Sequence, residues 1–139
     1  MRTITILFAA ALACCITPAA AEATKAQARD LEAQVRDADE LIALAIQLAD
    51  RVTLLKQSAR LSRLSGDFPS LVFEAYGNCR MAAAALSGIA STFSNGVDAE
   101  LFRFAVSVID GYDETLRDCD KSIGVKYRKG PLKALRDSP

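Results

Sequence analysis

The chain has 139 residues, of which 17 are basic and 17 are acidic, so its formal net charge is zero. This balance argues against a nucleic-acid-binding protein, which needs a concentrated basic face to neutralise phosphates. The chain contains no histidine, which excludes Ser-His-Asp and Cys-His catalytic centres, histidine-containing zinc sites and the usual haem ligand. We therefore expect neither an enzyme nor a bound cofactor.

Residues 1–21 have the pattern of a secretory signal peptide. A basic residue precedes an apolar run, and three alanines precede Glu22. The apolar run is too short to span a bilayer as a helix, which takes about 20 residues. We therefore expect a cleaved leader and a periplasmic or secreted mature protein. Cys14 and Cys15 leave the alternative of lipoprotein processing, which would anchor the protein to a membrane.

The first helix is predicted to start at Thr24, which forms a capping box with Gln27. No glycine or proline follows until Gly66, so we expect a single helix of about 40 residues. Its second half carries one continuous apolar stripe, made of Leu41, Leu44, Leu48, Val52, Leu55 and Ala59.

The charged first half of this helix, residues 29–40, is the first candidate for a contact surface. Packing against a single core explains its thin apolar stripe less well than the rest of the helix. A second helix could pair with this stripe as in a coiled coil. The candidate partner-binding residues are Leu31, Val35, Arg36, Asp39 and Glu40. The partner is expected to be another protein or, alternatively, a second copy of this chain.

Two shorter helices are predicted to follow a turn marked by Gly66 and Pro69. The second helix is expected to bury the stripe Val72, Tyr76, Cys79, Ala83, Leu86, Ala90 and Phe93. The third helix is expected to bury Ala105, Ile109, Tyr112, Leu116, Cys119 and Ile123. The predicted fold class is therefore all-α, a small three-helix bundle with a long first helix.

Cys79 and Cys119 lie on the apolar stripes of neighbouring antiparallel helices. In an exported protein such an even pair favours a disulfide. Counting residues back from a short loop, however, puts Cys79 level with Asp113, about 9 Å short of Cys119. A break at Gly77 and Asn78, or a tilted third helix, would close this gap. An intermolecular bridge and free thiols stay as alternatives.

Three carboxylates recur at four-residue steps on one face of the third helix, at Asp110, Glu114 and Asp118. Such an arrangement could hold a divalent cation. Arg117 and Lys121 are interleaved with these residues, which favours an ordinary solvated acidic face. We therefore assign no metal site and keep a divalent-metal or small-ligand carrier as an alternative function.

Residues 126–139 are expected to form a basic tail after the helical domain, residues 22–125. Basic side chains can contact anionic lipid headgroups, but a free, solvated terminus explains the same composition. We expect membrane contact only through this tail or through a lipid on the chain.

These features together predict a periplasmic or secreted helical domain that binds another protein. An inhibitor, an immunity protein or an adaptor would have this form. A structural homo-oligomer that pairs through the first helix is the alternative from a different class.

Overall fold

The computed structural model describes residues 22–96 and 99–138, so the predicted signal peptide and lipoprotein site lie outside the described residues. The all-α class is confirmed for these two ranges, which contain no strand. Their helices are α1 (Lys25–Gln47), α2 (Arg51–Asp67), α3 (Gly77–Ser94), α4 (Ala99–Ile123) and α5 (Pro131–Arg136). None of the helices found in this part of the chain is long and apolar enough to cross a membrane.

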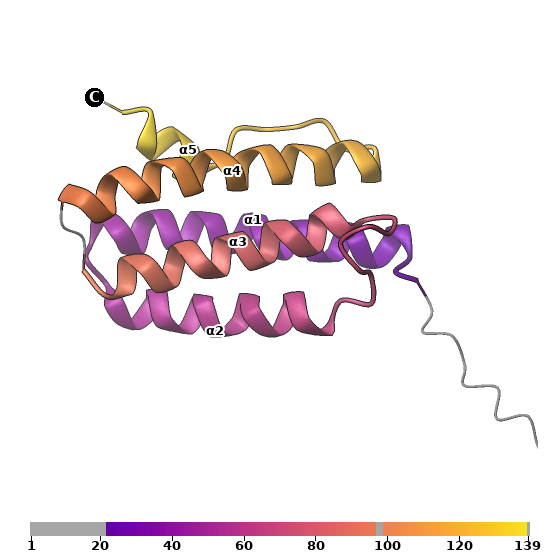
Figure 1. Ribbon diagram of the computed structural model, residues 1–139, viewed down its shortest axis with the longest axis horizontal. Helices are drawn as coiled ribbons and strands as arrows, with labels where there is room; N and C mark the ends of the chain where they lie inside the picture. The colour runs from indigo at the N-terminus through magenta and orange to yellow at the C-terminus, as the bar shows by residue number, and fades with distance from the viewer. Residues whose placement is uncertain (1–21, 97–98, 139) are drawn as a thin grey trace, which may run out of the picture.

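The four long helices run alternately in opposite directions and lie side by side (Figure 1). α3 contacts all three of the others, and the short α5 packs against α1 and α4. This is the up-down-up-down arrangement of a four-helix bundle, in which short loops join antiparallel neighbours.

The prediction of one long first helix is wrong, because the chain reverses between Gln47 and Arg51. Ala49 has a left-handed backbone, with φ of 52°. Asp50 then caps the new helix by accepting a hydrogen bond from the Thr53 backbone N–H at 3.1 Å. A capping carboxylate satisfies one of the free N–H groups of a helix start, so a helix can begin here without glycine or proline.

The reversal also changes which face of the first two helices is buried. The stripe expected from residue 41 to residue 59 is exposed, whereas the core takes Ala38 and Ile42 of α1 and Leu54 and Leu61 of α2. A stripe that is continuous in one helix cannot face one core after the chain turns back on itself. The predicted stripe of α4 is buried throughout, as is that of α3 from Cys79 to Phe93.

The second predicted helix starts later than expected, because residues 68–76 form a loop. Tyr76 adopts a left-handed backbone with φ of 66° directly before α3. Gly77 packs so closely against the backbone carbonyls of Leu71 and Val72 that a Cβ atom would not fit. The predicted break near Gly77 is therefore a helix start, and Val72 lies on the exposed part of the loop.

Cys79 and Cys119 form the predicted disulfide, with Cα atoms 4.7 Å apart. The predicted gap between the two cysteines assumed that Phe93 lies level with Ala99. Phe93 instead lines the same cavity as Ala105, because the first turns of α4 extend past the end of α3 (Figure 1). This offset of six residues along α4 brings Cys119 to Cys79.

The C-terminal segment, residues 125–138, packs on the bundle and is not a separate tail. Leu132 of α5 is fully buried, and its backbone N–H donates to Asp39 Oδ1 at 2.9 Å. Arg36 donates to the backbone carbonyl of Arg128 at 2.9 Å. The segment therefore closes the side of the bundle where α1 and α4 meet.

Candidate binding surfaces

The residues predicted to bind a partner serve mainly to hold the chain together. Leu31, Val35 and Asp39 are buried, and Arg36 is half-buried between α1 and α4. Glu40 alone of the five is exposed. Most of the charged half of α1 is thus packed within the chain, while Asp37 and Glu40 are exposed.

Arg36 bridges two buried carboxylates, Glu32 on α1 and Asp120 on α4. Burial raises the pKa of Asp120 to about 6, against the opposing attraction of Arg36, and the neighbouring Glu32 adds to the rise. Oδ1 of Asp120 is buried without a hydrogen-bond partner in the described part of the chain. The Arg36 guanidinium therefore forms ion pairs with two carboxylates, and the net charge of this cluster depends on pH.

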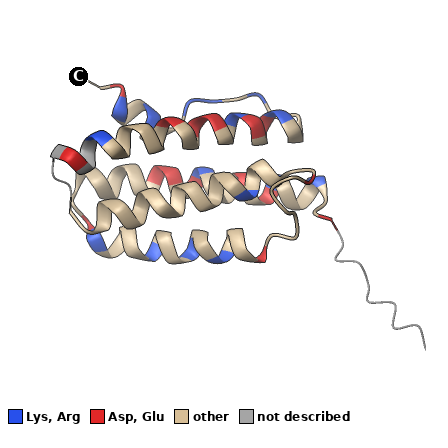
Figure 2. Ribbon diagram, viewed as in Figure 1, with Lys and Arg blue, Asp and Glu red and all other residues tan. Residues whose placement is uncertain are grey.

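The acidic face of α4 lies against the basic C-terminal segment (Figure 2). Asp110 pairs with Lys133 and Arg136, and the hydrogen bond from Lys133 is the main reason that its pKa is lowered. Asp113 accepts a hydrogen bond from the Tyr127 hydroxyl at 2.5 Å. Within residues 22–96 and 99–138 no three acidic or cysteine side chains are placed to hold a metal ion.

A cavity of about 300 Å³ lies where α1, α4 and α5 meet. Its lining is mostly apolar and includes Ile46, Phe93, Ile109 and Leu135, while Arg136 is already paired with Asp110 and Asp137. Small-molecule sites usually add several convergent polar groups to an apolar lining. Besides Arg136, the polar side chains that line this cavity are Gln47 at the end of α1 and Ser138 near the end of the described chain, and both residues are exposed.

The turn between α1 and α2 leaves an apolar surface uncovered. Its members, each 43% to 68% exposed, are Leu41, Leu44, Leu48, Val52 and Leu55, which we call the hairpin surface. Leu41 and Leu44 lie on adjacent turns of α1, Val52 and Leu55 lie on adjacent turns of α2, and Leu48 lies in the turn between the two helices. Together they expose on the order of 400 Å² of apolar surface, as much as the largest patch on a typical monomer.

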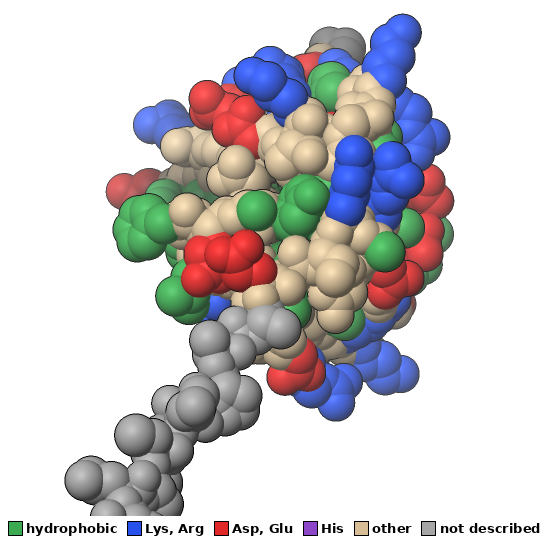
Figure 3. All heavy atoms as spheres, turned by 90° about the vertical axis from the view of Figure 1, so that its right-hand side faces the viewer, with side chains coloured by type: hydrophobic (Ala, Val, Ile, Leu, Met, Phe, Trp, Pro, Cys, Tyr) green, Lys and Arg blue, Asp and Glu red, His purple; other side chains and the backbone are tan. Residues whose placement is uncertain are grey.

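A second apolar surface is formed by Leu71, Val72 and Phe73, which we call the loop tip. All three are exposed, and Phe73 is 100% exposed. Figure 3 views the end of the bundle that carries this loop and shows hydrophobic side chains protruding at its left edge. The sequence did not predict this surface, because Val72 fits a helical stripe and the local signal was only the apolar run that follows Pro69 and Ser70.

Hydrogen bonds within the loop and to α3 fix its shape. Glu74 accepts from the Leu71 backbone N–H at 2.7 Å, and the Ser70 hydroxyl donates to the Ala75 carbonyl at 2.8 Å. Arg80 of α3 donates to the Ser70 carbonyl at 3.1 Å. The loop tip is thus a preformed protrusion, and a preformed loop loses less conformational freedom when it binds.

Comparison of this chain with protein-family models, with curated proteins and with solved structures finds no match.

Proposed function

We propose that the protein is an exported helical domain that binds another protein, as an inhibitor, an immunity protein or an adaptor. In this proposal the loop tip enters a pocket of the partner. The observation that carries it is a fully exposed Phe73 on a loop whose backbone is held by its own hydrogen bonds.

The energetics of Phe73 support this role. Burying an apolar side chain of this size on binding contributes about 1.5–3 kcal/mol. Aromatic side chains in desolvated pockets are frequent anchors of protein interfaces. A protruding tip matches a concave partner, whereas two such tips would bury little of each other. The partner in this proposal is therefore a different protein.

The disulfide supports the same role, because it holds the base of the loop. Cys79 lies two residues after Gly77, where the loop enters α3, and joins this point to α4. Such a cross-link restricts the unfolded chain, and disulfides persist in the oxidising compartments to which an export signal directs a protein.

Site-specific photocrosslinking in the producing cells tests the proposal. A benzophenone amino acid replaces Phe73 in one strain and the exposed Ser107 of α4 in a control strain. We expect a protein that is crosslinked from position 73 and not from position 107. Identical crosslinking patterns from the two positions would contradict a role for the loop tip.

The identity of the crosslinked protein then separates the classes of partner. If it is an enzyme or a toxin whose activity falls when this protein is added, the protein is an inhibitor or an immunity protein. If its activity is unchanged and a third protein is recruited, the protein is an adaptor.

A further inference from the structure

We propose that the hairpin surface joins two copies of this chain in a symmetric dimer. This inference goes beyond the proposed function, because the hairpin surface and the loop tip are made of different residues and carry separate contacts.

The apolar area of the hairpin surface fits a stable interface. A standard interface buries about 800 Å² on each partner, of which roughly 56–65% is apolar. The exposed aliphatic side chains of the hairpin surface, on the order of 400 Å², supply most of that apolar part. Leu48, at the reversal itself, is 68% exposed, so no residue of 22–96 or 99–138 covers it fully.

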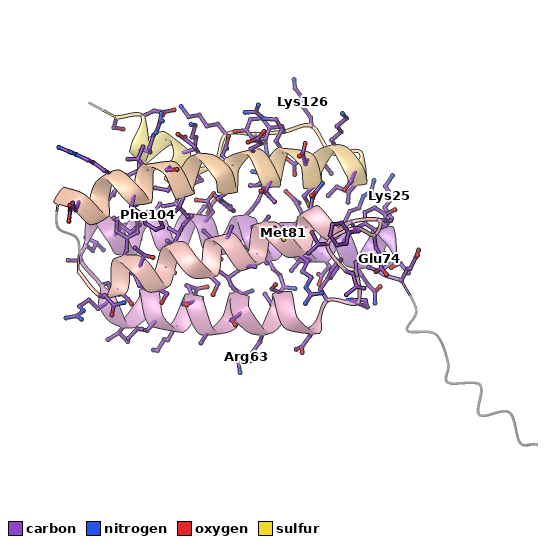
Figure 4. The ribbon with its side chains drawn as sticks, in the orientation of Figure 1. Lys25, Arg63, Glu74, Met81, Phe104 and Lys126 are labelled. Carbon is purple, nitrogen blue, oxygen red and sulfur yellow. A yellow bond between two sulfur atoms is a disulfide. The ribbon has the colours of Figure 1, made fainter. Side chains whose placement is uncertain are left out.

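The charges around this surface are divided between the two helices. α2 carries the basic residues Arg51, Lys56, Arg60 and Arg63 and a single acidic residue, Asp67, at its end. The outer face of α1 next to Leu41 and Leu44 carries the exposed acidic residues Asp37 and Glu40. Figure 2 shows Lys and Arg positions in blue along the ribbon of α2, and the side chain of Arg63 points away from the bundle (Figure 4).

The alignment of α1 with α2 determines which of these charges share a level. Arg60 donates to Gln34 Oε1 at 3.1 Å, so residue 60 lies beside residue 34. Antiparallel helices rise equally per residue, so Lys56 lies level with residue 38, between Asp37 and Glu40. Acidic and basic side chains thus occupy the same level on neighbouring helices.

A two-fold axis parallel to α1 and α2 brings the acidic and basic residues of two copies to the same level. It places α1 of each copy against α2 of the other, because equivalent surfaces exchange contacts around a two-fold axis. Leu41 and Leu44 then face Val52 and Leu55 of the second copy, and the acidic residues of α1 face the basic row of α2. Opposite charges across an interface fix the register and disfavour other partners.

The first test is the molar mass of the exported protein, purified from the producing cells, by light scattering coupled to size-exclusion chromatography. We expect a dimer. We expect Leu44→Asp to raise the dimer dissociation constant at least about tenfold, since burying a leucine contributes 1.5–3 kcal/mol and 1.4 kcal/mol is tenfold. Phe73→Asp is the matched control on the loop tip and should leave the dimer intact.

Charge exchange keeps the proposal testable if Leu44→Asp alters the fold, which circular dichroism would reveal. Lys56→Glu should weaken the dimer, and adding Asp37→Lys to the same chain should restore it. A wild-type monomer would overturn the proposal, as would a dimer that withstands both Leu44→Asp and Lys56→Glu. In either case the loop tip could still bind its partner, so failure of the dimer is distinguishable from failure of the proposed function.

Discussion

The hydroxyl of Tyr112 donates a hydrogen bond to Asp39 Oδ2 across 3.0 Å, where α1, α4 and α5 meet. The other oxygen of the same carboxylate accepts the backbone N–H of Leu132. Burial raises the pKa of Asp39 and that of Tyr112, so the phenol stays a donor at neutral pH. One buried carboxyl group therefore connects α1 and α4 to the C-terminal segment.

Asp39→Ala is expected to lower the free energy of unfolding by about 2–5 kcal/mol. The substitution leaves the Leu132 N–H and the Tyr112 hydroxyl buried without partners, and each such group costs about 1–3 kcal/mol. Tyr112→Phe removes only one of the two hydrogen bonds and should cost less. Urea denaturation of both variants measures this order, and a larger loss for Tyr112→Phe would contradict the role given to Asp39.

Gly130→Ala is expected to loosen the C-terminal segment, because a Cβ atom at this position would overlap the carboxylate of Asp39. Gly111, inside α4, is the matched control, since nothing lies within 4 Å of a Cβ atom added there. Gly111→Ala should instead stabilise the protein by about 0.5–1 kcal/mol through the helix propensity of alanine.

Thermal unfolding and limited proteolysis after residue 125 measure the effects of the two glycine substitutions. An unchanged Gly130→Ala variant, with its C-terminal segment as resistant to protease as that of the wild type, would show that Asp39 does not clamp this segment.

Replacing both Cys79 and Cys119 with serine is expected to lower the free energy of unfolding by about 4 kcal/mol. The bridge closes a long loop, with a sequence separation of 40. Loss of this constraint mainly raises the conformational entropy of the unfolded chain, which stabilises the unfolded state. Urea denaturation of the wild type with a reductant should approach that of the double variant. If the reductant left the wild type unchanged while the double variant was destabilised, packing of the serines and not the bridge would be responsible.

Stability should fall as the pH rises from about 4 to about 6. The folded protein holds the Asp120 proton more tightly than the unfolded chain, because burial raises the pKa from 3.8 to about 6. A group with a raised folded-state pKa stabilises the protein fully below its unfolded pKa, and this contribution is lost as the pH passes through the folded value. Asp120→Asn should therefore flatten the pH dependence of the free energy of unfolding in this window.

Urea denaturation at steps across the same pH range measures that slope in the wild type and the variant. The slope is the decisive quantity, because Asp120→Asn also removes the ion pair with Arg36 and shifts stability at every pH. Equal slopes in the two proteins would contradict the assignment to Asp120.

The apolar faces of α3 and α4 were predictable because each is a regular stripe in a helix that faces one core throughout. The same periodicity misled us in the first two helices, where Asp50 caps a new helix inside an uninterrupted pattern. An aspartate can lie inside a helix as well as at its start, so Asp50 alone does not predict a new helix. The reversal is stabilised by the packing of α2 along α3.

The buried role of Asp39 could not be predicted from its neighbours in the sequence. It lies among charges that are typical of a solvated helix face, and its partners are 73 and 93 residues away. The loop tip was missed for a different reason. The Leu71 N–H donates to Glu74 and Arg80 donates to the Ser70 carbonyl, and these bonds hold the segment outside any helix. Contacts distant in sequence thus determine the role of Asp39, whereas side-chain hydrogen bonds between residues close in sequence determine the shape of the loop tip.

The affinity of the partner crosslinked from position 73 for wild-type and Phe73→Ala protein tests the central claim most directly. The side chain of Phe73 is fully exposed, so its removal should leave the fold and the thermal stability unchanged. Titration calorimetry is expected to show at least about tenfold weaker binding for Phe73→Ala, and wild-type affinity for Leu44→Asp. Equal affinity of the wild type and Phe73→Ala would contradict binding through the loop tip.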